Sequence, residues 1–175
     1  MAEIIGGGKF EQVLSALGER LGKKVQVNVG FLDSASYPDK DINVPTVAAI
    51  NNFGAPEAGI PARPFFSNMI AENSGEWADK FATVLKSCNY DTDQALELMG
   101  NGMMGQLIES IVNTDSPPNA DVTNLLKQRF PTGEGVTFAD VQQARRDVAA
   151  GATAPAGKPL SWSGNLLHSV DKEVL

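Results

Sequence analysis

The chain has one cysteine, Cys88, and one histidine, His168, so a single thiol–imidazole pair is the only such pair it can form. An imidazole-activated thiolate is a nucleophile for acyl transfer, and it needs a third group that orients the imidazole. Cys88, however, follows Phe81, Val84 and Leu85 at helical spacing, which is typical of a thiol packed in a core. No serine lies in a Gly-x-Ser-x-Gly elbow. We therefore expect no nucleophilic catalysis.

The residue types are equally unsuited to metal or phosphate chemistry. One cysteine and one histidine do not make an ordinary zinc site. Asp91 and Asp93 lack the regularly spaced oxygen ligands of an EF-hand calcium loop. The triplet Gly6–Gly8 is not followed by Lys-Ser or Lys-Thr, so it is not a phosphate loop. We expect no metal, no cofactor and no enzymatic activity; a carboxylate-dependent hydrolase of the cell wall is a remote alternative, because no spacing singles out a carboxylate pair.

Composition indicates a folded acidic protein. The 175 residues carry a net charge of −7 and are 42% hydrophobic, which predicts one domain over residues 1–175. Eight carboxylates and two lysines lie between Glu72 and Asp115, so this stretch holds six of the seven excess negative charges. Such a surface repels phosphate backbones, which argues against sequence-specific nucleic-acid binding. With no signal-peptide pattern and no long apolar run, we expect the chain in the cytoplasm of the cell that makes it.

Hydrophobic periodicity predicts an α+β fold, in which a small antiparallel sheet packs against several helices. The strict alternation in "KVQVNVGFL" predicts a half-buried strand at residues 25–31, and the last residues of the chain are expected to form a second strand. Helical spacing predicts helices, in chain order, at residues 10–21, 45–53, 65–88, 91–100, 104–112, 122–126 and 137–148.

Some of these helices carry specific expectations. Val47 and Ile50 are expected to face inward, and Gly100 is expected to end the helix that Asp91 opens. The stretch "ENSGEW" at residues 72–77 is expected to bend or break the long helix. Thr137 is expected to cap a helix that turns Phe138, Val141, Ala144 and Val148 to one side.

The segment from Pro131 to Gly157 differs in texture from the rest, since its helix leads into the small-residue stretch "AAGATAPAG". Two interpretations remain open. The segment is an arm on a tether that reaches an adjacent protein, or it is an excursion that folds back on its own domain. Either way it is expected to be an insertion in the C-terminal half.

Several stretches resemble one family. "VAAINNFGAPEAGIPARPFF" is similar to a hallmark of bacteriophage tail-completion or neck (head–tail joining) proteins, in which an Ala-rich helix runs into Asn-x-Phe-Gly and then Ile-Pro-x-Arg-Pro-Phe. "SPPNADVTNLLKQ", "KPLSWSGNLLHSVDKEVL" and the early strand resemble further family stretches in the same order. The resemblance covers residues 23–130 and 158–175. Asn52 stands where an acid is common, and "SWSG" replaces Asp-Thr-Gly.

The resemblance implies a structural role. Such proteins form or cap rings at the junction of head and tail, through which DNA passes. Their partners are copies of themselves and neighbouring neck, portal-side or tail proteins, with no membrane, in the virion or in the host cytoplasm during assembly. A tail terminator or a minor tail protein is the alternative structural role. A concentrated acidic segment would let passing DNA slide rather than bind.

We expect the loop from Gly54 to Pro64 to be a stiff protrusion that docks on a neighbouring subunit, because prolines reduce the entropy lost on ordering. Arg63 and Phe65 have the character of an anchor pair. The alternative is that Phe65 and Phe66 begin a core helix. The residues expected at protein–protein interfaces are Phe53, Gly54, Ile60, Pro61, Arg63, Pro64, Phe65, Trp162 and Gly164.

Overall fold

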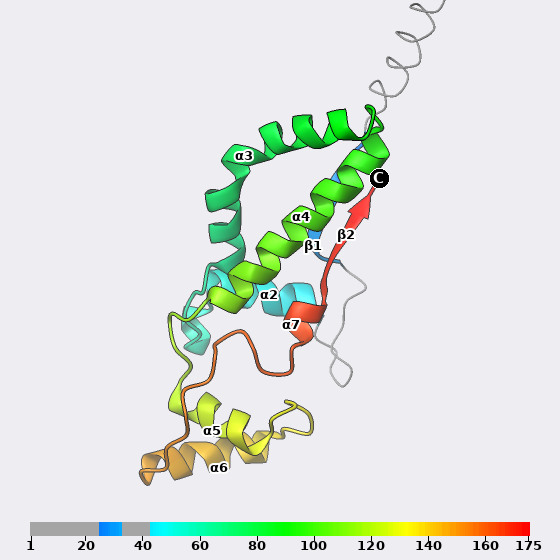
Figure 1. Cartoon of the computed structure of the whole chain (residues 1–175). Coiled ribbons are helices and arrows are strands. Elements are labelled where there is room, and N and C mark those ends of the chain that lie inside the picture. The colour runs from blue at the N-terminus through cyan, green and yellow to red at the C-terminus, as the bar shows by residue number, and fades with distance from the viewer. Residues whose placement is uncertain (1–24, 33–42) are drawn as a thin grey trace, which may run out of the picture.

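The computed structural model describes residues 25–32 and 43–175 (Figure 1). The helix predicted at residues 10–21 and the triplet Gly6–Gly8 lie outside the described residues. Two strands, β1 (Val27–Phe31) and β2 (Val170–Val174), pair antiparallel with Val27 opposite Val174 and Phe31 opposite Val170. Helices pack around this small sheet, so the expected α+β class is confirmed.

The helices are α2 (Val44–Phe53), the 3₁₀ turn η1 (Pro56–Ala58), α3 (Phe65–Ser87), α4 (Thr92–Asn113), α5 (Asp121–Arg129), α6 (Phe138–Ala149) and α7 (Asn165–His168). Those predicted within the described residues occur in the expected order, but the two predicted at 91–100 and 104–112 form one helix, and η1 and α7 were not predicted.

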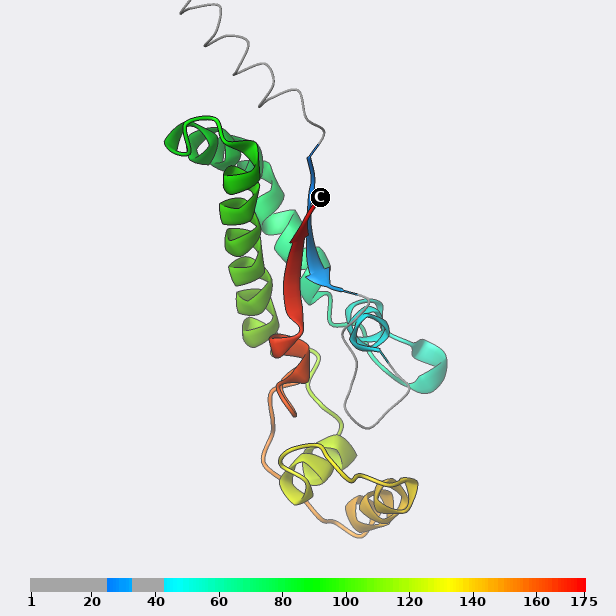
Figure 2. The same cartoon turned by 90° about the vertical axis from the view of Figure 1, so that its right-hand side faces the viewer.

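Helix α4 runs alongside both strands (Figure 2) and does not end at Gly100, as the sequence had led us to expect. A Cβ added at Gly100 would lie 2.7 Å from Lys172 Cδ and 3.0 Å from Val27 Cγ2. The glycine is therefore where the sheet comes closest to the helix, and its function is packing rather than termination. The predicted break between residues 100 and 104 is wrong for the same reason.

Helices α3 and α4 form an antiparallel hairpin. The stretch 72–77 does not break α3, which is continuous from Phe65 to Ser87, but Figure 1 shows the helix bending midway along its length. Trp77 Nε1 donates to Gln106 Oε1 at 3.0 Å and ties the two helices together. Asp91 caps α4 as predicted, because its side chain accepts from the Gln94 amide at 3.0 Å.

The main core lies where α2, α3, α4, α7 and β2 meet. Its most completely buried side chains are Phe65, Leu107, Ile111 and Val44. The inward faces of α2 differ from the expectation. Val44, Ala48 and Asn52 are its buried positions, whereas Ile50 is 36% exposed, so its predicted inward orientation is wrong. The helix begins one residue before Pro45, with Asn43 as its cap, and its buried positions recur every four residues.

Helices α5 and α6 form a smaller lobe, separated from the sheet by two connecting segments (Figure 1). Leu125, Leu126 and Ala144 are its buried residues, and Val141 and Val148 pack against them. Thr137 and Asp140 form a capping box at the start of α6. Phe138 does not face inward as predicted but is 75% exposed, because the cap places it in the first turn, outside the contact with α5.

The helix of the segment 131–157 thus packs on α5 in this structure, and the role of the segment as an insertion or arm stays a prediction. None of the helices in the described part of the chain is long and apolar enough to cross a membrane.

Candidate functional site

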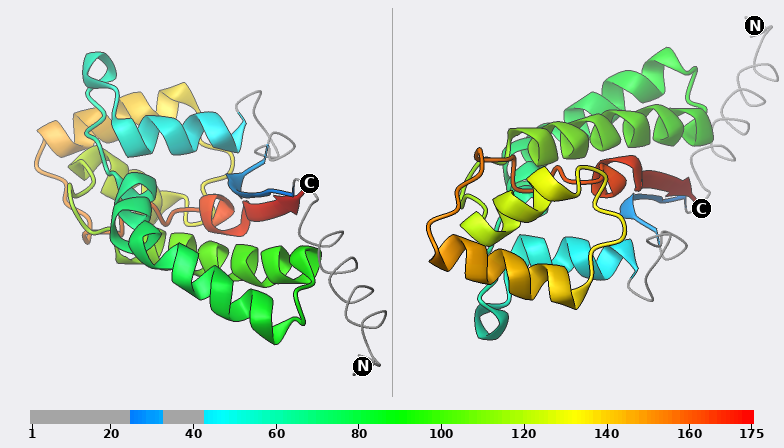
Figure 3. Two further views of the ribbon diagram at one scale, coloured as in Figure 1. Left: turned by 90° about the horizontal axis from the view of Figure 1, so that it is seen from above. Right: turned by 90° about the horizontal axis from the view of Figure 1, so that it is seen from below.

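The loop from Gly54 to Pro64, called the proline-rich loop below, is held rigidly at its base. Asn52 is only 4% exposed, and its side-chain oxygen accepts from the amides of Phe66 and Ser67 at 3.0 and 3.1 Å. It therefore provides the cap that α3 lacks at Pro64. Gly54 has φ 78°, and a Cβ there would lie 2.7 Å from the Ala62 amide nitrogen. Ala55 and Ile60 pair as an antiparallel bridge. The loop therefore leaves and returns by a narrow neck, and Figure 3 shows it standing away from the rest of the chain.

Arg63 connects this loop to the turn before α5. Its side chain is only 6% exposed, and its Nε and Nη2 donate to the carbonyls of Pro117 and Pro118 at 2.9 and 3.1 Å. These two carbonyls follow the cis Ser116–Pro117 bond. Two N–H groups of this guanidinium thus bond to neutral carbonyls and join the loop to the turn before α5 in the interior of the molecule.

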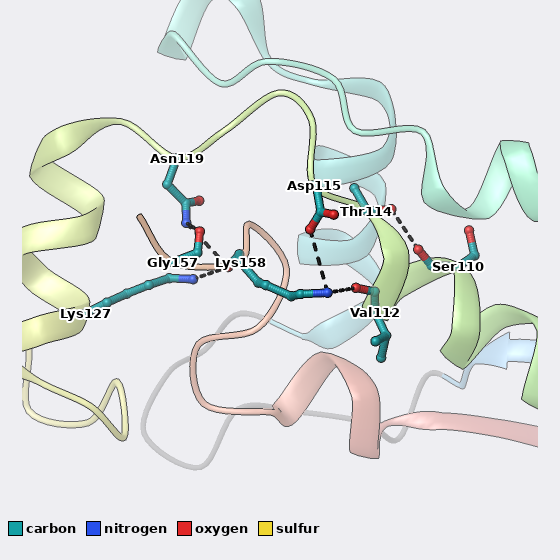
Figure 4. Close-up of polar contacts among 8 residues, drawn as sticks. All are labelled: Ser110, Val112, Thr114, Asp115, Asn119, Lys127, Gly157 and Lys158. Atoms are coloured by element: carbon teal, nitrogen blue, oxygen red, sulfur yellow. Dashed lines mark hydrogen bonds and ion pairs between the residues drawn. The ribbon is translucent and has the colours of Figure 1, made fainter. Parts of the chain in front are cut away.

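A second set of polar contacts connects the lobe to the chain that returns from it (Figure 4). Lys158 Nζ donates to the Val112 carbonyl at 2.7 Å and lies 3.7 Å from Asp115 Oδ1. Asn119 Nδ2 donates to the Gly157 carbonyl at 2.9 Å. Lys127 Nζ donates to the carbonyls of Lys158 and Ser161, the latter at 3.1 Å. The last segment is thereby held against both α4 and α5.

A groove of about 800 Å³ lies between these three pieces of chain: the proline-rich loop, the start of α5 and the segment 159–166. Its lining contains seven of the nine residues predicted for an interface, namely Phe53, Gly54, Ile60, Pro61, Arg63, Trp162 and Gly164. Phe53 is 74% exposed. The structure thus brings together, in one place, residues that are about a hundred positions apart in the sequence.

The groove is positively charged although the chain is acidic. Arg63 and Lys127 line it, and none of the described residues in its lining is Asp or Glu. Burial lowers the pKa of Arg63. Burial also lowers the pKa of Lys127, and the neighbouring charge of Arg63 lowers it further. Among the described residues neither cation forms an ion pair, so the wall carries two positive charges with no carboxylate opposite. Such a surface favours an anionic group.

The anchor pair predicted from the sequence needs correction. Phe65 is 1% exposed and belongs to the main core, which supports the alternative that it begins a core helix. Phe65 is therefore not available to a partner in this fold, whereas Arg63, at 6% exposure, still lines the groove. Pro64, the residue before α3, is exposed but does not line the groove.

The remaining interface residues stay predictions. Trp162 is half-buried, with its Nε1 donating to the Phe130 carbonyl at 2.7 Å, and Gly164 has φ 78° directly before α7. Sequence reasoning missed Lys127 and Asn119 as residues of this groove. A signal for Lys127 existed, since it is a basic residue in a short helix of an otherwise acidic chain.

The residues considered for catalysis, Cys88 and His168, do not lie together. Cys88 is the buried residue that ends α3, and His168 is the last residue of α7, and Figure 1 places those helix ends at opposite ends of α4. In the described ranges, 25–32 and 43–175, no group of three His, Cys, Asp or Glu side chains is placed to hold a metal ion.

Comparison with known proteins finds no family model, no curated protein and no solved structure that matches this chain.

Proposed function

We propose that this chain is a structural protein of a bacteriophage virion, placed in the neck between head and tail. There it forms or caps a ring through which DNA passes, with other copies of itself and adjacent neck or tail proteins as partners. The proposal assigns it no enzymatic activity and no cofactor. It starts from the sequence resemblance, and one structural observation supports it.

That observation is that the four stretches which resemble the family contact one another in the structure. Arg63 of the proline-rich stretch bonds to Pro117 and Pro118 of the second stretch. Asn119 and Lys127 of the second stretch donate to backbone carbonyls of the third, at Lys158 and Ser161. The early strand pairs with the final strand. The four stretches thus form one connected unit in this fold, which supports the resemblance.

The acidic segment fits the same role. All eight carboxylates between Glu72 and Asp115 are exposed on the α3–α4 hairpin and the turn after it. Ion pairs with Lys80, Lys158 and Lys172 engage some of them. A surface of exposed carboxylates repels DNA phosphates over about a Debye length, roughly 8 Å at physiological salt. Lining a channel, it would let DNA pass without binding.

The test is the position of the protein in particles of the phage that encodes it. Immunogold labelling of intact virions is expected to place it at the head–tail junction. Loss of its gene is expected to leave filled heads and separate tails of normal length, and expression from a plasmid should restore joining. Tails of irregular length would favour the terminator role instead. Labelling elsewhere, or absence from virions, would refute the proposal.

A further inference from the structure

The two cations of the groove lack a negative partner within the described chain. A charged side chain taken out of water is ordinarily paired, because neutral carbonyls do not cancel its charge. Arg63 is 6% exposed and still has three N–H groups beyond the two that reach Pro117 and Pro118. Lys127, on α5, likewise bonds only to backbone carbonyls. The unbalanced charge points to an anion supplied from outside the chain.

The proline-rich loop offers such an anion on its far side. The tip of the loop is η1, with Glu57 between Pro56 and Ala58, and all three are exposed. Pro56 and Gly59 line the chain's own groove, whereas Glu57 does not. Among the described residues Glu57 forms no ion pair. The tip is therefore narrow, stiff and singly charged.

We infer that the groove of one copy receives the η1 tip of a second copy, so that Glu57 lies opposite Arg63 and Lys127 of its neighbour. This inference rests on the proposed ring. The groove volume of about 800 Å³ suits a tip of three small or medium residues. Phe53 at 74% exposure supplies an apolar surface against which Pro56 and Ala58 pack. The loop is ordered before contact, so little entropy is lost on docking.

A second copy is favoured over another partner by the way the two surfaces are arranged. Tip and groove are different surfaces of one chain, so the contact is head-to-tail and repeats from copy to copy. Such a contact closes into a ring when its rotation closes. The same loop forms a wall of its own groove, and occupation of one groove therefore also steadies the tip that enters the next.

Disulfide trapping tests the geometry directly. In a Cys88→Ala background, one preparation carries Glu57→Cys and another Thr123→Cys, a groove residue on α5. Mixed and oxidised mildly, they are expected to give a cross-linked dimer, with the joined peptides identified by mass spectrometry. Glu134→Cys in place of Glu57→Cys is the matched control, because it is also an exposed acid, and it should give none. Absence of the Glu57–Thr123 link would overturn the inference.

Charge reversal tests the pairing without a cross-link. The native mass of the intact protein is measured by light scattering over a hundredfold concentration range. Glu57→Lys is expected to raise the concentration needed for association by about tenfold or more, since a like charge would face Arg63 and Lys127. Glu134→Lys, with the same change of charge, should stay within about twofold of the unaltered chain.

The outcomes separate the two proposals. If the chain forms oligomers and the two variants behave alike, the tip-in-groove contact is wrong while the ring stands. If the unaltered chain stays monomeric throughout and the Glu57→Cys and Thr123→Cys preparations give no cross-link, a second copy is not the occupant, and labelling of virions alone decides the neck role. If Glu57→Lys weakens binding to another virion protein but not self-association, the groove or tip serves that partner, and the inference is again overturned.

Discussion

The body and the lobe of this molecule are held together in different ways. The body is formed by the sheet, α2, α3, α4 and α7, and within the described residues its main core contains nine buried hydrophobic side chains, among them Phe65, Leu107 and Ile111 at 1% exposure or less. The lobe of α5 and α6 has three, and one of them is the small Ala144. Its other contacts are half-buried aliphatic and aromatic side chains, a capping box and the Arg129–Asp147 ion pair.

The difference implies unequal local stability. Burial of apolar area is the main favourable contribution to folding, so the body is the cooperative unit and the lobe depends on polar contacts to stay attached. The segment 158–170 serves both parts, because Leu160 and Leu166 enter the body core while Trp162 packs on the lobe. The groove lies where the two parts meet.

The largest effect is expected from truncating a side chain in the body core. Leu107→Ala removes a side chain of 0% exposure at the centre of the body and should destabilise the protein by about 2–5 kcal/mol. Leu125→Ala in the lobe should instead open α5 and α6 locally. Urea unfolding with hydrogen exchange separates the two. A lobe variant that lowers protection equally in α4 would show that body and lobe unfold together.

The second effect concerns the connection between the parts. Arg63→Ala leaves the carbonyls of Pro117 and Pro118 without their donor, and we expect a loss of about 2–4 kcal/mol. Arg63→Lys should recover only part, because an ammonium cannot reproduce the planar guanidinium fork. Amide exchange should rise first in α5 and α6. Arg145→Ala, an exposed arginine on α6, is the control and should change little. A neutral Arg63→Ala would mean that the tie does not hold the lobe.

Sequence reasoning identified what local pattern determines. The alternation around Val27 and Val29, the Asp91 cap and the Thr137 cap all predicted elements that the structure contains. It failed where a contact with residues distant in the sequence determines the local structure. Gly100 looked like a helix end because its reason for being small, the approach of Lys172 and Val27, is a tertiary contact. Hydrophobic periodicity cannot predict that contact.

The candidate site shows the same division. The proline-rich loop was recognised from its residues, but the role of Arg63 was not. Arginine is mostly exposed in proteins, and its acceptors here lie 54 and 55 positions further along the chain. Ile50 and Phe138 were placed inward from spacing alone, yet they are 36% and 75% exposed. Spacing identifies residues that share a helix face, but the elements that cover a face are distant in the sequence.

A third prediction separates packing from propensity within the body. Gly102→Ala, where nothing lies within 4 Å of the new Cβ, should stabilise the protein by about 0.5–1 kcal/mol through helix propensity. Gly100→Ala gains the same propensity but meets Lys172 and Val27, so we expect a net loss of about 1–2 kcal/mol. Thermal unfolding of the two variants measures the difference. Equal stabilisation would mean that the sheet shifts freely away from α4.

A fourth prediction concerns the lobe alone. Thr137→Ala removes the side chain that accepts from the Asp140 amide and should cost about 1 kcal/mol. The loss should be confined to α6 and should leave exchange in α4 unchanged. Thr137→Ser, which keeps the acceptor oxygen, is the conservative control and should restore most of the protection. If α4 loses protection as well, the lobe is not a separate unit.

The smallest effect is expected from pH, and it too should single out the lobe. Hydrogen bonds from Arg129 and Gln143 lower the pKa of Asp147, and a side-chain hydrogen bond from Thr137 lowers the pKa of Asp140. A lowered folded-state pKa means that the stabilisation is complete above the ordinary carboxyl value of 3.8 and is lost as pH falls through the lowered value. Amide protection of α6, corrected for intrinsic exchange rates, should therefore decrease below about pH 4.

In the body, a hydrogen bond from Lys80 lowers the pKa of Glu76 in the same way. This pair lies on an exposed face of α3, away from the main core. Protection of α4 should accordingly change less over the same range. Asp147→Asn cannot be protonated, so this variant should show a weaker acid response in α6 together with lower protection at neutral pH. An unchanged acid response in that variant would assign the effect to other carboxyls. It would also mean that the ion pair with Arg129 adds little to the attachment of α6.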